Sequence, residues 1–196
     1  MTGGRPALQL PRRPDEPRWV DDVLRYWFLE IAPKAWFVRD AAVDADIQQR
    51  FGPLHATLAA EPAPRAPSDS RIELARVIVL DQFPRNIFRG SAEAFATDTL
   101  ALATAKASVA AGLDQPLDGT GRLFLFLPFE HSEVAADQQR AVDLIGAIGD
   151  AEYTRFARAH KDIIDRFGRF PHRNPVLGRV FTPDEIAFLA QPGSSF

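Results

Sequence analysis

Apolar side chains at helical spacing, interrupted by prolines, constrain the fold of this chain most. In 40–60, for example, Val43, Ile47 and Phe51 fall on one face of a helix because they recur every three or four positions. We expect Pro53 to kink or split this helix, since proline lacks the N–H that the preceding turn needs. The same spacing recurs between most of the other prolines. The pattern predicts an all-α protein.

Six further segments have the character of helices. The run 71–83 leaves little polar face and is expected to lie centrally, and Ser70 with Glu73 fits a capping box at its start. The segment RLFLFLPF, 122–129, is continuously apolar, and its lack of β-branched residues favours a buried helix over a strand. Other predicted helices are 98–111, which stops at Gly112, 133–148, 151–167, and one that begins at Thr182-Pro183-Asp184-Glu185. The sequence predicts seven to nine helices in all.

The length of the chain and the placing of its prolines indicate one domain with a tail. The 196 residues are enough for one sizeable core, and no internal repeat of fixed period is visible. Residues 1–17 contain four prolines and two adjacent glycines, which is typical of a flexible tail. We therefore predict a tail over 1–17 and a single all-helical domain over 18–196.

Composition excludes several classes of function. A net charge of −3 and a pI near 5.8 argue against nucleic acid as a partner. The longest apolar run, Leu123–Phe129, is too short to cross a bilayer, and the N-terminus lacks the apolar stretch of a signal peptide. The absence of cysteine is compatible with a reducing compartment. We expect a soluble cytoplasmic protein with no membrane partner, and the oligomeric state stays open.

The chain contains none of the common cofactor or nucleophile signatures. There is no GxxxxGK[ST], GxGxxG, GxSxG or HExxH sequence. His131-Ser132-Glu133 matches the HxE of zinc deaminases, but their cysteine ligands are missing here. A metal site built from histidines and glutamates has no support from ligand spacing. The sequence therefore predicts no cofactor and no metal.

Three polar clusters adjoin apolar residues, at 81–89, 129–133 and 166–174. The first contains FPRN and the third FPHRN, and in each an apolar helix runs into Phe-Pro. Proline disfavours helical geometry in the residue before it, so we expect the chain to turn at Phe83-Pro84 and at Phe170-Pro171. The following arginine and asparagine side chains can then bond the last carbonyl groups of each helix.

These clusters have two interpretations. In one, the arginines pair with carboxylates inside the protein and tie helix ends together, since charges beside a core must be paired. In the other, the clusters line a groove that binds a small anionic or peptide ligand, because arginine forks suit carboxylates. The residues assigned to ligand binding are Gln82, Arg85, Asn86, Arg89, Glu133, His172, Arg173 and Asn174.

Two alternatives to this ligand-binding hypothesis come from other functional classes. In the first, the protein is a hydrolase-like enzyme whose catalytic residues are His131 and Glu130, because imidazole titrates near neutral pH and the adjacent glutamate can orient it. In the second, the protein is a helical scaffold for a protein partner and the polar clusters are purely structural.

Three long motifs also resemble a known family. LDQFPRNIFRG, RLFLFLPFEHSE and RFGRFPHRN, in this order and with WF pairs at 27–28 and 36–37, are similar to the bacterial family called domain of unknown function 924. The resemblance covers about residues 20–190. It implies an antiparallel stack of helices, similar to tetratricopeptide (TPR) repeats, and it implies no particular activity.

Overall fold

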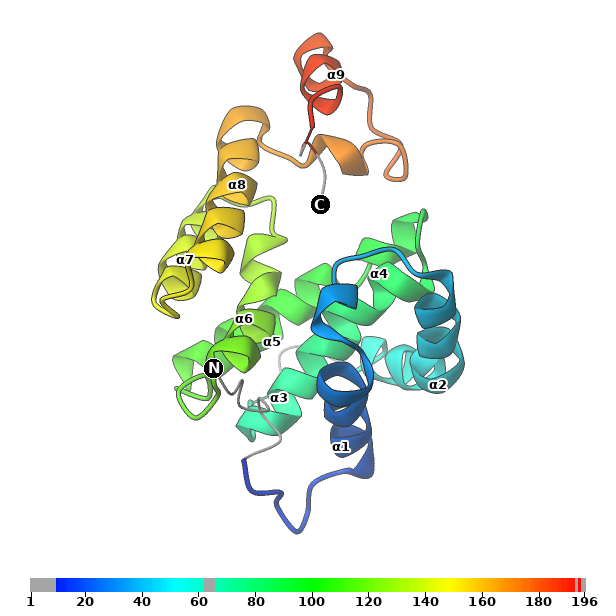
Figure 1. Ribbon diagram of the computed structural model, residues 1–196, viewed down its shortest axis with the longest axis vertical. Helices are drawn as coiled ribbons and strands as arrows, with labels where there is room; N and C mark the ends of the chain where they lie inside the picture. Colours follow the sequence, from blue (N-terminus) through cyan, green and yellow to red (C-terminus); the bar gives the residue numbers. More distant parts are fainter. Residues whose placement is uncertain (1–9, 62–65, 193, 195–196) are drawn as a thin grey trace.

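The computed structural model describes residues 10–61, 66–192 and 194, and these residues form helices joined by turns (Figure 1). There is no β-strand in this described part, so the all-α prediction is confirmed. The α-helices are α1 (Arg18–Arg25), α2 (Ala41–Ala59), α3 (Ser70–Val77), α4 (Phe83–Ile87), α5 (Asp98–Ala110), α6 (Gly119–Glu130), α7 (Ala135–Gly146), α8 (Ala151–Phe167) and α9 (Pro183–Leu189).

Shorter helical turns of other types join or extend these helices. The π-helical segments are η1 (Tyr26–Glu30) and η3 (Ile78–Gln82), and the 3₁₀ turns are η2 (Pro33–Ala35), η4 (Ala92–Phe95) and η5 (Pro171–Arg173). Because η3 joins α3 to α4 without a break, the described residues form eight helical rods, within the predicted range. Among those residues, no helix combines the length and the apolar character needed to cross a bilayer.

The rod formed by α3, η3 and α4 lies at the centre of the fold. Helices α1, α2, α5 and α6 pack around it, and α7 and α8 lie side by side beyond α6 (Figure 1). Leu74, Ile78 and Leu80 in the central rod are fully buried, as the nearly all-apolar sequence of this segment predicts. The segment RLFLFLPF is helical within α6, so that prediction is also confirmed. Stacking in the manner of TPR repeats stays a prediction.

The chain after α8 packs against the end of that helix through a second, small hydrophobic cluster. Ile163, Ile164 and Phe170 are buried in this second cluster, with Phe167 and Phe188 packed against them. The main cluster, by contrast, runs from α1 to α8. In Figure 1 the segment with η5 and α9 lies at the top, beyond the end of α8. Apolar contacts with the end of α8 and polar side chains at the junction together join this C-terminal segment to the main body.

The predicted turn at Phe83-Pro84 is wrong, because the helix continues through it to Ile87. The π-helical segment makes this continuation possible: the N–H of Phe83 donates to the carbonyl of Ile78, five residues back. Proline cannot donate to the carbonyl of Leu80, and the hydroxyl of Thr97 on the neighbouring chain segment bonds that carbonyl instead, at 2.6 Å. The guanidinium of Arg85 donates to the next carbonyl, that of Asp81, at 2.7 Å.

Other helix boundaries follow local chemistry with small shifts. Helix α2 passes through Pro53 without being split. The N-cap residue of α3 is Asp69 rather than Ser70, because the Asp69 carboxylate accepts the backbone N–H of Arg71. The capping box of α9 is present as predicted: Thr182 accepts the N–H of Glu185, and that glutamate accepts the N–H of Thr182.

The predicted tail, 1–17, overlaps only partly with the described residues, since 1–9 lie outside them. Glu16, near the end of this range, is buried and forms a two-pronged ion pair with Arg71, at 2.8 and 3.1 Å. Asp21 of α1 also accepts from this guanidinium, at 3.2 Å. These ion pairs join Glu16 and α1 to α3, and the division into a tail and a single domain stays a prediction.

Candidate functional site

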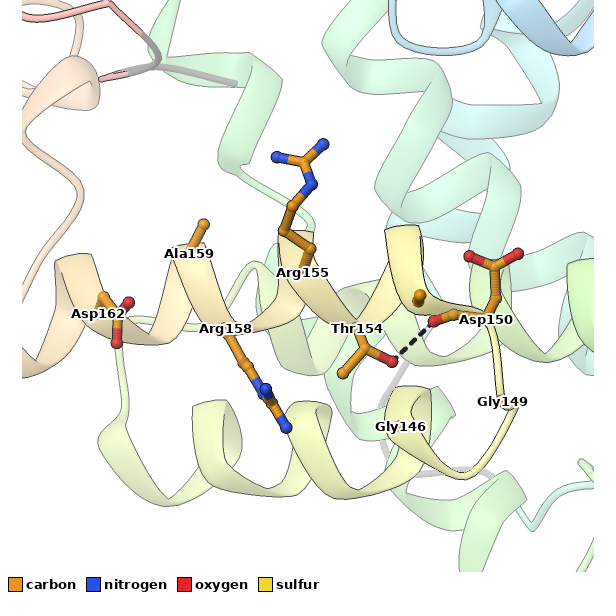
Figure 2. A pocket seen from close by; sticks show the side chains of 9 residues that line it. Gly146, Gly149, Asp150, Thr154, Arg155, Arg158, Ala159 and Asp162 are labelled. Carbon is orange, nitrogen blue, oxygen red and sulfur yellow. Dashed lines mark hydrogen bonds between the residues drawn. The ribbon is translucent and has the colours of Figure 1, made fainter.

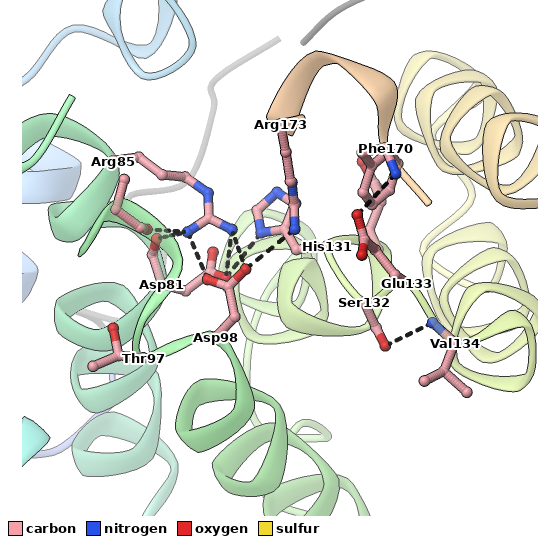
Figure 3. Close-up of polar contacts among 12 residues, drawn as sticks. Asp81, Arg85, Thr97, Asp98, His131, Ser132, Glu133, Val134, Phe170 and Arg173 are labelled. Carbon is pink, nitrogen blue, oxygen red and sulfur yellow. Dashed lines mark hydrogen bonds and ion pairs between the residues drawn. The ribbon is translucent and has the colours of Figure 1, made fainter. Parts of the chain in front are cut away.

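Five side chains from distant parts of the sequence meet at the junction between the main body and the C-terminal segment (Figure 3). They come from η3, α4, the start of α5, the end of α6, and η5. Hydrogen bonds and ion pairs connect all of them. We call this group the polar junction, and its members are Asp81, Arg85, Asp98, His131 and Arg173.

Asp81 and His131 form a hydrogen-bonded pair at the centre of the polar junction. Asp81 is fully buried, and one of its carboxylate oxygens lies 2.8 Å from Nδ1 of His131. Burial alone would raise the pKa of Asp81, but His131, Arg85 and Gln82 stabilise the carboxylate and lower that pKa. The pKa of His131 is lowered too, because burial outweighs the attraction of Asp81. At neutral pH the pair is therefore an aspartate beside a neutral imidazole.

Asp98 connects the two arginines of the polar junction. Its carboxylate accepts both Nη atoms of Arg85, at 2.9 and 3.2 Å, and a longer bond of 3.4 Å from Nη1 of Arg173. Burial by itself would lower the pKa of Arg85, but Asp81 and Asp98 outweigh it and raise that pKa. Arg85 thus faces two carboxylates, whereas within the described part of the chain Arg173 bonds one carboxylate, which it shares with Arg85.

The guanidinium of Arg173 contacts two aromatic rings and makes one long hydrogen bond. Its central carbon lies 4.6 Å from the ring centre of Phe95 and 4.5 Å from that of Phe170. Among the described residues, the contact with Asp98 is the one hydrogen bond of this side chain, and Nε is buried without a partner. Burial, together with the neighbouring charge of Arg85, lowers the pKa of Arg173 to about 10. It remains charged at neutral pH but is incompletely compensated.

Residues on both sides of Arg173 also carry unpaired polar atoms. Nδ1 of His172 and Oδ1 of Asn174 are buried without a hydrogen-bond partner in the described part of the chain. Burial, followed by the charge of Arg173, lowers the pKa of His172 to about 4, so that this ring is neutral at pH 7. The amide nitrogen of Asn174 donates to Glu185 at 3.3 Å. Native proteins leave few such atoms unpaired, so three in consecutive residues require an explanation.

The predicted pairing of His131 with Glu130 is not what the structure contains. The carboxylate of Glu130 lies 2.9 Å from Nδ1 of His160 on α8. Consecutive residues at the end of a helix point in different directions, and so Glu130 and His131 meet different neighbours. Asp81, fifty residues earlier, holds the imidazole instead.

Three predicted ligand-binding residues are engaged away from the polar junction. Asn86 donates to Asp44 of α2 at 2.8 Å, and Arg89 pairs with both oxygens of the same carboxylate at 2.7 Å. These bonds tie α4 to α2. Glu133 accepts the N–H of Phe170 and the guanidinium of Arg179, both at 2.8 Å, which ties the C-terminal segment to the start of α7. Gln82, by contrast, donates to Asp81 and so supports the polar junction.

Arg85, Arg89 and Arg173 therefore have carboxylate partners, as the ion-pair interpretation predicts. Two of these partners, Asp98 and Asp44, were not predicted from the sequence. Asp98 and Asp44 stand in the first turns of α5 and α2. An acid in that position is typical of ordinary helix-end electrostatics, so neither residue stood out. Their partners lie 13 to 75 residues away, and no local pattern indicates such pairings.

A surface depression of about 620 Å³ lies elsewhere, where α7 turns into α8 (Figure 2). Gly149, Asp150, Arg155 and Arg158 are among its lining residues. None of the predicted site residues lines it, and the Asp150 carboxylate already caps α8 by accepting the N–H groups of Glu152 and Tyr153. Within the described residues, no group of three or more histidine, aspartate or glutamate side chains has the arrangement of a metal site.

Comparisons with known proteins agree with the fold and the motifs. A family model described as "Bacterial protein of unknown function (DUF924)" matches residues 23–193. Among solved structures, the chain is similar to one described as "Structure of Protein of Unknown Function ATU0120 from Agrobacterium tumefaciens", with 40% sequence identity and a TM-score of 0.82. That match covers 87% of this chain and 96% of the other, while no curated protein matches. The chain therefore belongs to the DUF924 family.

Proposed function

We propose that the protein binds a small anionic ligand at the polar junction, with the guanidinium of Arg173 as the anchor. The ligand carboxylate would take the donors of Arg173 that have no protein partner, and His172 and Asn174 would contact it from the same turn. The observation that carries this proposal is the contact of the guanidinium with the rings of both Phe95 and Phe170 while its buried Nε has no partner among the described residues. Such an arginine is held in place for a planar, two-pronged contact before the ligand arrives.

The charge count of the polar junction favours a ligand with one negative charge at the anchor. Two guanidinium groups, Arg85 and Arg173, face two carboxylates, Asp81 and Asp98, and the two histidines nearby have lowered pKa values. The group is therefore close to neutral, and each added negative charge works against two existing carboxylates. A single carboxylate costs less in this respect than a phosphate dianion. The long 3.4 Å contact with Asp98 is the one that a ligand carboxylate would replace.

Solvent reaches the junction at its edge. The side chains of His131, Asp98 and Arg85 are 14%, 20% and 22% exposed, so a small anion can approach them from outside. Other predicted ligand-binding residues have roles that fit a support for the site: Gln82 holds Asp81, and Asn86 and Arg89 fix α4 on α2. Such limited exposure suits a small carboxylate better than an extended peptide.

Titration of the purified protein with acetate, succinate and inorganic phosphate, followed by calorimetry, tests the proposal. We expect succinate, which brings only one of its two carboxylates to the anchor, to bind more tightly than phosphate, whose two charges both lie there. Arg173→Gln should weaken succinate binding at least about tenfold, since a charged hydrogen bond is lost. The matched control is Arg155→Gln, which removes the same charge from an exposed helix position. Arg173→Lys separates the effect of the positive charge from that of the guanidinium geometry, because lysine keeps the charge and loses the planar pair of donors.

Circular dichroism melting curves show whether each variant is folded before its affinity is compared. Absence of succinate and acetate binding in the folded wild type contradicts the proposal. Equal affinities in the wild type and in folded Arg173→Gln also contradict it. If Arg155→Gln loses binding and Arg173→Gln keeps it, the ligand binds in the depression beside α8 and the proposal is wrong.

A further inference from the structure

The geometry around His131 defines which of its ring nitrogens is available for chemistry. Asp81 is an ionised carboxylate and can only accept a hydrogen bond, so the Nδ1 atom of His131, 2.8 Å away, must carry the proton. Nε2 is then the nitrogen with a free lone pair. No hydrogen bond to Nε2 is formed within the described part of the chain, and the side chain remains 14% exposed. The ring therefore presents an unoccupied proton acceptor at the open edge of the polar junction.

Asp81 is held more firmly than a solvent-exposed partner would be. It is fully buried, Gln82 donates to its other oxygen, and the Arg85 guanidinium lies 3.6 Å from the oxygen that bonds His131. The π-helical segment that carries Asp81 also brings it under α6, where His131 follows the last helical residue. Segments of this kind recur at functional sites because they direct side chains away from the regular helical positions.

We propose that His131, positioned by Asp81, acts as a general base that activates water to hydrolyse a small carboxylic ester whose second carboxylate is anchored by Arg173. This inference rests on the anion-binding function proposed above and extends it from a ligand to a substrate. Arg173 and His131 belong to one network, linked through Asp98 and Arg85, so an anion on the guanidinium would lie beside the open edge of the imidazole. His131 touches the reacting water, whereas Asp81 acts only through His131 and is a positioning residue.

The reaction balances with water as the only co-substrate. Nε2 of His131 takes a proton from water while the water oxygen bonds to the ester carbonyl carbon and an electron pair moves to the carbonyl oxygen. The carbonyl then re-forms, the bond to the alcohol oxygen breaks, and the proton on Nε2 passes to that leaving oxygen. His131 returns to its neutral state, and the new carboxylic acid releases its proton to solvent. Asp81 stabilises the imidazolium that exists between the two proton transfers.

The probe is mono-p-nitrophenyl succinate, which has one carboxylate and one ester, with neutral p-nitrophenyl acetate as its matched control. We expect kcat/KM for the anionic ester to exceed that for the neutral ester about tenfold or more, as Arg173 contributes a charged contact. His131→Gln should lower kcat roughly 100-fold or more, in keeping with the usual contribution of a general base. His55→Gln, which changes a buried histidine outside the polar junction, should leave kcat unchanged.

The pH profile tests the positioning role of Asp81. The groups that face His131 are Asp81, Arg85, Asp98, His160 and His172. Asp81 raises the pKa of His131 against the effect of burial. Asp81→Asn should therefore lower kcat, leave KM within about twofold, and move the profile midpoint to lower pH, since the attraction that favours the imidazolium is lost. A purely structural role would reduce the fraction of folded enzyme without moving the midpoint.

The outcomes distinguish the two proposals. If folded wild type binds succinate but hydrolyses the anionic ester no faster than His131→Gln does, the hydrolase inference is wrong and the binding function stands. If the ester is hydrolysed in a His131-dependent way while succinate neither binds nor inhibits, the anion-binding function is wrong and the Asp81–His131 base stands. An Asp81→Asn profile with an unchanged midpoint and unchanged kcat removes Asp81 from the mechanism.

Discussion

Nδ1 of His131 lies 2.8 Å from the carboxylate of Asp81, a fully buried residue fifty positions earlier in the chain. The contact joins the two polar motifs LDQFPRN and EHSE, which are far apart in the sequence, at the end of α6. It also fixes which imidazole nitrogen is protonated, because the ionised carboxylate can only accept. Through Asp81, hydrogen bonds and ion pairs connect this ring to Arg85, Asp98 and Arg173, and the proposed function depends on this arrangement.

Asp98 should matter more to stability than an exposed acid does. Replacing it by Asn removes the carboxylate that Arg85 and Arg173 share, and we expect a loss of about 2 kcal/mol in the free energy of unfolding. The loss should be smaller than for a fully buried pair, because Asp81 continues to face Arg85. Asp165→Asn is the control: this carboxylate is 46% exposed in its pair with Lys161 one helical turn away, and its removal should cost less than about 0.5 kcal/mol.

Urea unfolding followed by circular dichroism measures both changes. The same Asp98→Asn variant should bind succinate more tightly than the wild type, because the ligand no longer competes with Asp98 for Arg173. Equal stability losses in the two variants, or weaker succinate binding in Asp98→Asn, would contradict the account.

The hydroxyl of Thr97 should compensate for the hydrogen bond that Pro84 cannot make. Thr97→Val leaves the Leu80 carbonyl without its 2.6 Å partner, and we expect unfolding to become easier by about 1–3 kcal/mol. Thr104→Val provides the control, since that hydroxyl bonds a carbonyl within a regular helix. In a Pro84→Ala background the Thr97→Val cost should shrink, because alanine supplies an N–H. A double-mutant cycle by chemical denaturation measures the coupling, and strict additivity would contradict the explanation.

Stability should fall as the pH is lowered from about 7 to 4, partly because of His172. Its folded pKa of about 4 lies below the ordinary value of 6.5, so between these values the unfolded chain binds more protons than the folded one. The contribution of His172 to the free energy of unfolding is then present above pH 6.5 and is lost towards pH 4. Discounted for screening by solvent, it amounts to roughly 2 kcal/mol. Arg173, His160, His131 and Glu133 face this ring and set its titration.

His172→Gln should flatten this dependence, since glutamine does not titrate. Urea unfolding at several pH values measures the slope for both proteins. An identical slope in the variant would show that other groups account for the acid sensitivity.

The helices could be predicted from sequence because their signals are local. The apolar spacing in α8, the capping box at Thr182 and Glu185, and the helical character of RLFLFLPF each depend on neighbours within a few residues. The exception is Pro84. Its local signal predicts a turn, but a π-helical segment and the Thr97 hydroxyl, which comes from elsewhere in the chain, let the helix continue.

The candidate site could be predicted only as a set of residue types. Arg85, Arg173 and His131 stood out because charged residues beside phenylalanines need partners. Which partners they find depends on the packing of η3, α5 and η5, and so Asp98 was missed and Glu130 was paired with the wrong group. Periodicity places a side chain on a face of its own helix, but it does not say which other helix that face meets.

The protonation state of the two ring nitrogens of His131 can be observed directly by NMR. Long-range ¹H–¹⁵N correlation spectra of the full chain, with His131 signals assigned by comparison with His131→Gln, report the state of both ring nitrogens at about pH 7.5. We predict a neutral ring with the proton on Nδ1, where Asp81 accepts it, and with an unprotonated Nε2. A ring protonated on Nε2 alone, or on both nitrogens at that pH, would contradict the account.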